Sequence, residues 1–211
     1  MKYKLILTTL VALQLSAGVF AQSEKKEDEE KTEKKSGFKK ENLFTGGNVA
    51  LGFSNGTFSF GVGPYFGYSL NKYIDVALSV NYNYVSQRDY VELGDKARQS
   101  VIGPGVFTRI YPVKFLFAQA QFEQNFIKFK YIPATNGTYN PYKDTKSVSS
   151  LLLGAGFASG REGIGEPYYY ISLMFDVLKN QNSPYVDQVG RMNPIIRAGY
   201  NIPLFQGKRG R

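Results

Sequence analysis

The 211-residue sequence contains neither cysteine nor histidine. Without cysteine, the chain forms no disulfide, offers no thiolate as a nucleophile or metal ligand, and carries no lipid on an N-terminal cysteine. Without histidine, it lacks the side chain that most often acts as a general base near neutral pH and that most protein zinc sites use. We therefore expect a protein that is not an enzyme and holds no metal or cofactor, although aspartate, glutamate and lysine remain available for chemistry.

A long apolar run is missing too, except for a short one at the N-terminus. Lys2 and Lys4 are followed by an apolar run over residues 5–15 and by small residues up to Ala21. This order is typical of a secretory signal peptide, residues 1–21, and the run is too short for a membrane-spanning helix. A retained N-terminal anchor is the alternative. We expect the mature chain to leave the cytoplasm.

Acidic residues are fewer than basic ones, 17 against 26, which gives a formal net charge of +9. An exported protein rarely meets nucleic acid, so an anionic membrane surface or plain solvation is the better explanation of this excess. Residues 22–42 depart from it, because seven lysines balance seven acidic residues there. This composition predicts a disordered periplasmic tether, with a surface helix of Glu–Lys pairs as the alternative. Residues 206–211 form a basic C-terminal tail.

Helix-spaced apolar residues are absent after the tether, and alternation with a period of two replaces them. In TFSFGVGPYFGYSL, residues 57–70, every second residue from Phe58 is apolar and the other set is mostly glycine, serine and threonine. Such alternation predicts a strand with one greasy and one small, polar face. The same pattern predicts further strands at 44–54, 74–86, 100–111, 114–129, 148–158, about 168–177 and 193–205. Asn55-Gly56 predicts a tight hairpin turn, and polar loops are expected at 87–98, 131–146 and 179–192.

Eight strands, an even number, connected as hairpins, favour a closed barrel. The interior of an eight-stranded barrel only just holds filling side chains, so the bulky Phe, Leu and Val set cannot all lie inside it. With the apolar set facing lipid and the small polar set inside, closure pairs every backbone group. The prediction is an all-β, eight-stranded antiparallel up-and-down transmembrane β-barrel over residues 43–205. Tyrosines near strand ends fit the membrane interfaces: Tyr68, Tyr73, Tyr82, Tyr84, Tyr111, Tyr168 and Tyr200.

These features resemble the small outer-membrane β-barrel, or porin-like, family, whose eight-stranded members include OmpX and the membrane domain of OmpA. The resemblance rests on the signal peptide, the even-numbered strands, VGPYFGY at 62–68, IGPGVFTRIY at 102–111, and the closing strand Arg197–Phe205. The terminal aromatic residue lies one place late, and QGKRGR follows it. The resemblance implies a monomer in the bacterial outer membrane with both termini in the periplasm, surrounded by outer-membrane lipid and lipopolysaccharide.

Four prolines fall inside or beside the expected strands, namely Pro64, Pro104, Pro194 and Pro203. Proline lacks the N–H that a strand donates to its neighbour. We therefore expect a bulge or a strand end at each of them.

Charged residues on the polar face point into the expected lumen. Arg109 and Glu123 lie on neighbouring strands, as do Asp176 and Arg197. Because buried charges need partners, we predict the cross-strand ion pairs Arg109–Glu123 and Asp176–Arg197. They fill the barrel or, alternatively, form a charged constriction that selects ions. Asp75, close to a turn, is expected to be in contact with water.

The long loops are the expected functional surface, because a rigid scaffold commonly carries recognition on its loops. Their aromatic residues are candidates for contact with an extracellular protein or glycan partner or, alternatively, for ordinary packing within the loops: Tyr90, Tyr131, Tyr139, Tyr142 and Tyr185. The leading hypothesis is a non-enzymatic outer-membrane barrel with a structural or surface-interaction role. The alternatives are a narrow porin-like diffusion channel and an outer-membrane enzyme acting on lipid or peptide, although barrel enzymes of that kind rely on histidine.

Overall fold

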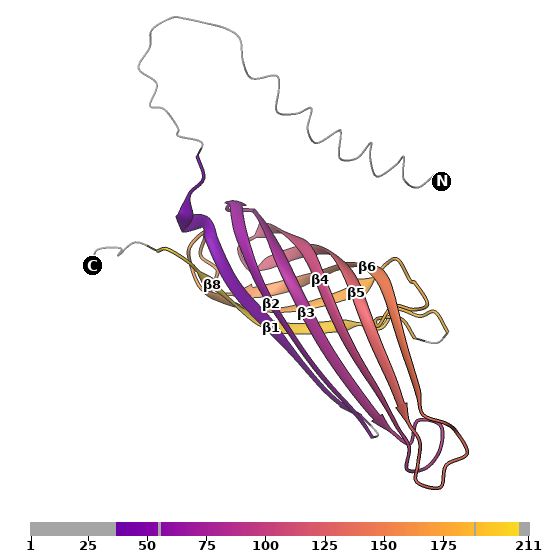
Figure 1. Cartoon of the computed structure of the whole chain (residues 1–211). Coiled ribbons are helices and arrows are strands. Elements are labelled where there is room, and N and C mark those ends of the chain that lie inside the picture. Colours follow the sequence, from indigo (N-terminus) through magenta and orange to yellow (C-terminus); the bar gives the residue numbers. More distant parts are fainter. Residues whose placement is uncertain (1–36, 55, 188, 207–211) are drawn as a thin grey trace, which may run out of the picture. The chain divides into compact units, whose positions relative to one another are not determined.

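The computed structural model describes residues 37–54, 56–187 and 189–206, which fold into eight antiparallel strands (Figure 1). Each strand pairs with its neighbours in sequence, and the first pairs with the last, so the sheet closes into a barrel. The predicted eight-stranded up-and-down barrel is thereby confirmed. The strands are β1 (Leu43–Ser54), β2 (Thr57–Asn71), β3 (Ile74–Arg88), β4 (Lys96–Val113), β5 (Leu116–Ile132), β6 (Tyr142–Ser159), β7 (Tyr168–Asp176) and β8 (Ile195–Pro203).

The expected signal peptide and most of the expected tether lie outside the described residues. The described end of the tether packs against the barrel. Lys40–Asn42 form a short 3-10 helix, the ring of Phe38 stacks on Tyr68 at 5.2 Å between centroids, and the backbone N–H of Lys39 donates to the Tyr68 hydroxyl. Among the described residues, no helix is long and apolar enough to cross a bilayer.

The two ends of the barrel differ in their connections. At one end, called the terminal end here, β1 begins, β8 ends, and the connections 72–73, 114–115 and 160–167 join the strands. The opposite end, called the loop end, carries the 55–56 turn and three longer loops, 89–95, 133–141 and 177–194. Gly56 has φ of +77°, as the tight hairpin turn requires.

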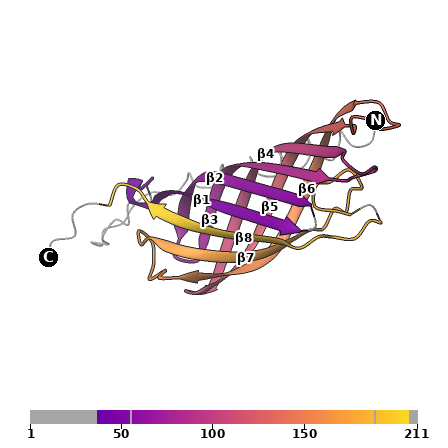
Figure 2. The same cartoon turned by 90° about the horizontal axis from the view of Figure 1, so that it is seen from below.

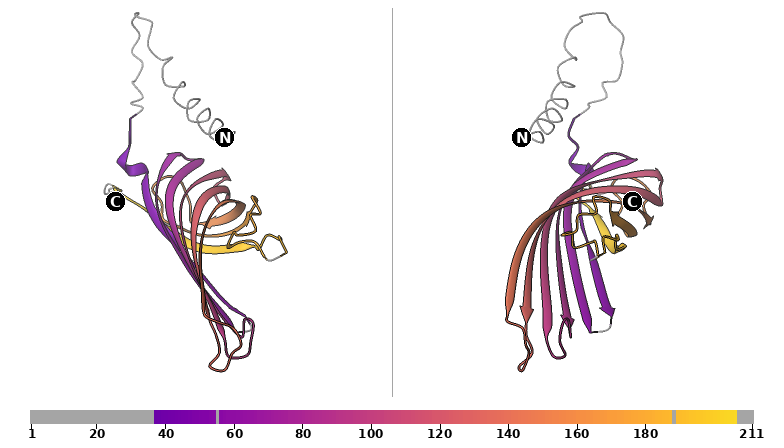
Figure 3. Two further views of the ribbon diagram at one scale, coloured as in Figure 1. Left: turned by 45° about the vertical axis from the view of Figure 1, so that its right-hand side comes forward. Right: turned by 90° about the vertical axis from the view of Figure 1, so that its right-hand side faces the viewer.

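The strands also differ in length, and this shapes the loop end. β4, β5 and β6 have 18, 17 and 18 residues, whereas β7 and β8 have nine each. β6 pairs with β7 only from Leu152 onward, and β1 pairs with β8 only as far as Val49. The loop end is therefore a curved sheet of β1–β6 that continues past the closed ring (Figures 2 and 3).

This extension corrects two predicted loops. The ladder continues to Arg88↔Lys96 and to Tyr131↔Tyr142, so the loops expected at 87–98 and 131–146 shrink to 89–95 and 133–141. The ends of these strands carry lysine, arginine and glutamine on their faces. Their polarity resembles that of a loop although their backbones pair with a neighbouring strand.

Side chains alternate across the barrel wall as the period of two predicts. In β2, Phe66 is 50% exposed and the neighbouring Tyr65 only 4%. Small residues on the inner face make room for their neighbours, because a Cβ on Gly63 would collide with the amides of Asn81 and Asn48. The greasy set therefore faces outward and the small polar set faces a narrow interior.

Some aromatic rings nevertheless point inward. They form a cluster at the terminal end that contains Phe44, Tyr65, Phe107, Tyr111, Phe117, Tyr168 and Tyr170. Tyr111 and Tyr168, expected at the membrane interface, are 1% and 3% exposed, and their hydroxyls hydrogen-bond at 2.7 Å. The reason is parity: Tyr111 lies two residues from the inward-facing Arg109, so the pleat directs both to the same side.

The prolines meet the expectation at the strand ends but not inside the strands. Pro194 precedes β8 and Pro203 ends it. Pro64 and Pro104 lie mid-strand with no bulge: each pairs with one neighbouring strand, while the ladder on the other side skips two positions and resumes in unchanged register. A gap on one side is enough, because a residue directs its N–H toward only one neighbour.

Candidate functional site

The inner face of β5 carries the polar residues that organise the lumen. Gln119, Gln121, Glu123 and Asn125 alternate with the outward residues Ala120, Phe122 and Gln124, and all four are buried. They form a polar spine along the barrel. Gln119 Nε2 donates to Gln121 Oε1 at 2.7 Å, and Gln121 Nε2 donates to Glu123 Oε1 at 2.9 Å.

Glu123 is the hub of this network. Its Oε1 accepts hydrogen bonds from Asn81 Nδ2 at 2.9 Å and from Arg197 Nη2 at 3.0 Å, besides the one from Gln121. Its Oε2 accepts the Tyr185 hydroxyl at 2.8 Å. Residues of β3, β5, β8 and the 177–194 loop thus converge on one carboxylate that has no exposed surface.

The ion pair between Glu123 and Arg197 crosses the lumen, because β5 and β8 are not neighbours in the ring. The predicted pairs Arg109–Glu123 and Asp176–Arg197 are therefore wrong, although all four side chains do lie inside the barrel. Register is the reason. Gly105 lies opposite Glu123 on β4, and Ser172 lies opposite Arg197 on β7.

Asp176, at the end of β7, holds the 177–194 loop. Its Oδ2 accepts the Ser183 hydroxyl at 2.6 Å, and its Oδ1 accepts the backbone N–H groups of Leu151 and Leu178 at 3.1 and 3.2 Å. The Leu151 contact falls where β6 loses β7 as a partner. Asp176 therefore satisfies a strand edge and turns the chain inward.

Tyr185 enters the lumen as a consequence of this turn. It is 7% exposed, packs against Leu152 and Met174, and donates to Glu123. Of the two alternatives for Tyr185, packing fits its position and contact with a partner does not. The sequence does not reveal this, because it does not show that the 177–194 loop folds back over the barrel opening.

The other predicted loop aromatics divide between loops and strands. Tyr90 and Tyr139 lie in loops and are 38% and 55% exposed. Tyr131 and Tyr142 lie instead at paired positions of β5 and β6, and Tyr131 is buried. Of the five predicted residues, Tyr90 and Tyr139 are thus the two that are exposed and lie in loops.

Arg109 is held differently from Arg197. Its guanidinium carbon lies 4.1, 4.7, 5.0 and 5.3 Å from the ring centroids of Tyr170, Phe107, Phe117 and Tyr65. Its Nε donates to Gln119 Oε1 at 2.8 Å. No carboxylate in the described part of the chain lies within ion-pair distance of Arg109. The quadrupoles of the surrounding rings therefore take the place of a counter-ion.

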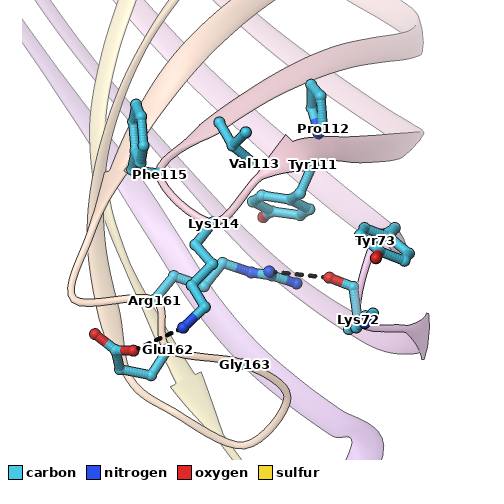
Figure 4. A pocket seen from close by; sticks show the side chains of 10 residues that line it. All are labelled: Lys72, Tyr73, Tyr111, Pro112, Val113, Lys114, Phe115, Arg161, Glu162 and Gly163. Atoms are coloured by element: carbon cyan, nitrogen blue, oxygen red, sulfur yellow. Dashed lines mark hydrogen bonds and ion pairs between the residues drawn. The ribbon is translucent and has the colours of Figure 1, made fainter.

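Arg161, in the 160–167 connection, closes the terminal end of the lumen. Its guanidinium lies 3.6 Å from the centroid of the Tyr111 ring, pairs with Asp75 at 3.8 Å, and donates to the carbonyl oxygen of Lys72 at 3.1 Å (Figure 4). Asp75 is 2% exposed, so the expectation that water surrounds it is wrong. The sequence reasoning missed Arg161 because its connection reads as an ordinary glycine-rich turn.

Beside Arg161 the rim of the barrel has an open depression of about 400 Å³. It lies between residues 72–73, the end of β4 with the 114–115 turn, and residues 161–163, and Lys114 pairs with Glu162 across it at 3.1 Å (Figure 4). Both of these side chains are largely exposed. The depression is thus a feature of the rim at the terminal end.

At the loop end, Asp95 fixes the 89–95 loop. Its carboxylate accepts the backbone N–H groups of Tyr90, Val91 and Glu92 at 2.5, 2.9 and 2.8 Å and the Tyr131 hydroxyl at 2.9 Å. Burial raises the pKa of Asp95, but these hydrogen bonds outweigh it, so the pKa lies below its ordinary value. The loop therefore depends on an ionised carboxylate.

In chemical terms, the lumen is a filled, cross-linked interior. A search of the described residues finds no group of three metal-ligating side chains. The signal that would have found the aromatic cage is the parity of Tyr65, Phe107, Phe117 and Tyr170 with the polar inner set.

Comparison with known proteins gives distant structural resemblances. No protein-family model matches the chain, and no curated protein is similar to it in sequence. The structure is similar to that of Ail, the attachment invasion locus protein of Yersinia pestis, in complex with the heparin analogue sucrose octasulfate, with 11% identity and a TM-score of 0.44 over 76% of this chain and 94% of that one. It is also similar to the N-terminal β-barrel domain of Pseudomonas aeruginosa OprF, with 14% identity and a TM-score of 0.37 over 76% and 95%. At these values, the function of this chain has to be inferred from its own residues.

Proposed function

We propose that this chain is a non-enzymatic integral outer-membrane β-barrel whose lumen is sealed and whose interactions take place on its outer wall and loop end. The observation that carries the proposal is the ion pair between Glu123 and Arg197, which bridges two non-adjacent strands through the middle of the lumen. Tyr185 lies on the loop-end side of this ion pair and the rings around Arg109 lie on its terminal-end side. Together these side chains fill the interior.

The outward face supports residence in a membrane. Large apolar side chains cover it on all eight strands, and many are about half exposed or more, among them Leu51, Leu78, Ile110 and Ile196. Soluble monomers rarely expose contiguous apolar patches larger than a few hundred Å². A closed barrel with this coat satisfies its backbone internally, which a bilayer demands.

The orientation follows from the connections. Small outer-membrane barrels have short periplasmic turns and longer extracellular loops. The terminal end, where β1 begins, β8 ends and the 72–73 and 114–115 turns lie, then faces the periplasm, and the loops 89–95, 133–141 and 177–194 face outward. Tyr90 and Tyr139 are the loop aromatics that remain available to an extracellular protein or glycan.

The test of this proposal has two parts. Barrel closure and insertion predict that the membrane-extracted protein migrates on a gel in a heat-modifiable manner. They also predict that the protein is absent from detergent-free aqueous fractions. A sealed lumen predicts no stable single-channel openings in planar bilayers. Protein that is freely soluble without detergent contradicts the membrane assignment, whereas inserted protein with stable openings supports the narrow diffusion channel instead.

A further inference from the structure

The outward face of β3–β6 changes character along the barrel axis. Going toward the loop end, one row holds the apolar or aromatic side chains of Tyr82, Ile102 and Phe126 on β3–β5, with Ser147 on β6. The next outward row already includes Lys128, and the one beyond it is strongly basic. The change from the apolar row to the basic row takes four residues of each strand, or about 13 Å.

The basic row consists of Arg98 on β4, Lys130 on β5 and Lys143 on β6. Arg98 lies directly opposite Lys130, and Lys130 lies directly opposite Lys143. With Lys128 one row below, these four side chains form a patch, called the basic patch here. Like charges opposite one another destabilise a sheet, so their alignment calls for an external counter-charge.

Nothing within the described part of the chain supplies that counter-charge. None of the four side chains forms an ion pair there. The nearest carboxylate in sequence, Asp144, follows Lys143 and is on the opposite face, where it pairs with Lys146 at 3.5 Å. The basic patch is exposed and uncompensated.

The patch also has a shape. An open depression of about 320 Å³ is lined by its four cations, by Tyr84, Ser100 and Thr145 on the outward face, and by Phe129 and Asp144, which belong to the inward-facing set. Ser100 and Thr145 are the cross-strand neighbours of Lys128, so two hydroxyl groups lie in the row beneath the cations. Ammonium, guanidinium and hydroxyl donors together suit the oxygens of a phosphate group.

We propose that the basic patch binds the phosphate groups of an anionic glycolipid in the outer leaflet. The inference rests on the proposed membrane function, because it places the patch at the level where the apolar coat ends and headgroups begin. This position favours a membrane lipid over a soluble polyanion: the apolar row two rows below the basic row contacts acyl chains, while the cations and the hydroxyl row between them meet the phosphates. A patch for a soluble ligand has no need to lie along this boundary.

The experiment compares three proteins, each folded in detergent and checked for heat-modifiable migration. They are the wild type, the variant R98Q/K130Q/K143Q, and the control K72Q/K114Q/K179Q, which removes the same charge from the terminal end and the 177–194 loop. Binding of diphosphorylated lipid A and of phosphate-free lipid A is measured by native mass spectrometry. Each cation near a membrane surface contributes about a fivefold gain in affinity, so the patch variant is expected to bind the phosphorylated lipid on the order of 100-fold more weakly.

The outcomes separate the two proposals. Wild-type preference for phosphorylated lipid, lost in the patch variant and kept in the control, supports the inference. Equal binding by wild type and patch variant overturns it, as does binding of soluble sucrose octasulfate without any preference for phosphorylated lipid A. The proposed function is overturned instead if the wild type does not insert or does not migrate in a heat-modifiable manner. Both properties are measured before any lipid is added.

Discussion

Two buried arginines divide the lumen into regions that handle the same charge in different ways. Toward the loop end, Arg197 meets the carboxylate of Glu123 within a set of hydrogen bonds. Toward the terminal end, Arg109 is surrounded by four aromatic rings and one amide. The polar spine joins them, since Gln119 accepts from Arg109 and Gln121 accepts from Arg197.

The difference shows what each region gives up when it is disturbed. A carboxylate that loses its arginine, or the reverse, leaves a full charge buried without compensation. The rings around Arg109 carry no net charge, so loss of the cation leaves no charge unpaired. It removes an attraction and leaves an apolar cavity. We therefore expect substitutions in the region toward the loop end, around Arg197 and Glu123, to lower the free energy of unfolding more than substitutions around Arg109.

The largest effect is expected for Glu123→Ala. The change leaves Arg197 unpaired in the interior and removes the acceptor of Asn81, Gln121 and Tyr185. Breaking a buried pair in this way costs about 3–5 kcal/mol of the free energy of unfolding. Urea unfolding of the folded barrel in detergent, followed by circular dichroism and gel mobility, measures it.

The matched control for that prediction is the double variant Glu123→Leu with Arg197→Met. It removes both charges and keeps their volume, so it is expected to be more stable than Glu123→Ala. A double variant that is no better than the single one would show that the charge pair is not the source of the loss.

A smaller effect is expected for Arg109→Met. The variant keeps an unbranched, polarisable side chain among the rings, and gives up the cation–π attraction and the Gln119 hydrogen bond. We expect a loss of about 1–2 kcal/mol, since a cation–π contact contributes up to about 2 kcal/mol when it is desolvated. The same urea titration decides. A loss as large as that of Glu123→Ala would mean that rings support a buried guanidinium as strongly as a carboxylate does.

The smallest effect is expected for Asp95, which lies outside both lumen regions. Its lowered pKa means that the loop gains stability from the ionised form above about pH 4, and that this stability is lost as pH falls through the lowered pKa. Asp95→Asn should speed amide exchange of Tyr90, Val91 and Glu92 at neutral pH and remove its acid dependence. Glu92→Gln, which leaves the Asp95 carboxylate in place, is the control. Unchanged exchange in Asp95→Asn would contradict the assigned role.

The sequence allowed the fold to be predicted because alternation is a local property. The direction of each side chain in β2 or β5 follows from the parity of its position, and so did the presence of Arg109, Glu123, Asp176 and Arg197 inside. Their pairing could not be predicted, because it depends on cross-strand register and on reach across a narrow lumen. The inward path of Tyr185 likewise depends on where β7 ends and on the Asp176–Ser183 contact.

The first and last strands meet over six residue pairs, from Phe44↔Pro203 to Val49↔Ala198, against 16 between β5 and β6. These six contacts join the most distant parts of the barrel sequence, so forming them carries the largest loss of chain entropy, whereas every other pairing is between strands adjacent in sequence. We therefore expect assembly to proceed as successive hairpins, with β1 and β8 zipping together last. We expect the hydrogen bonds between β1 and β8 to break first when the barrel is pulled or heated.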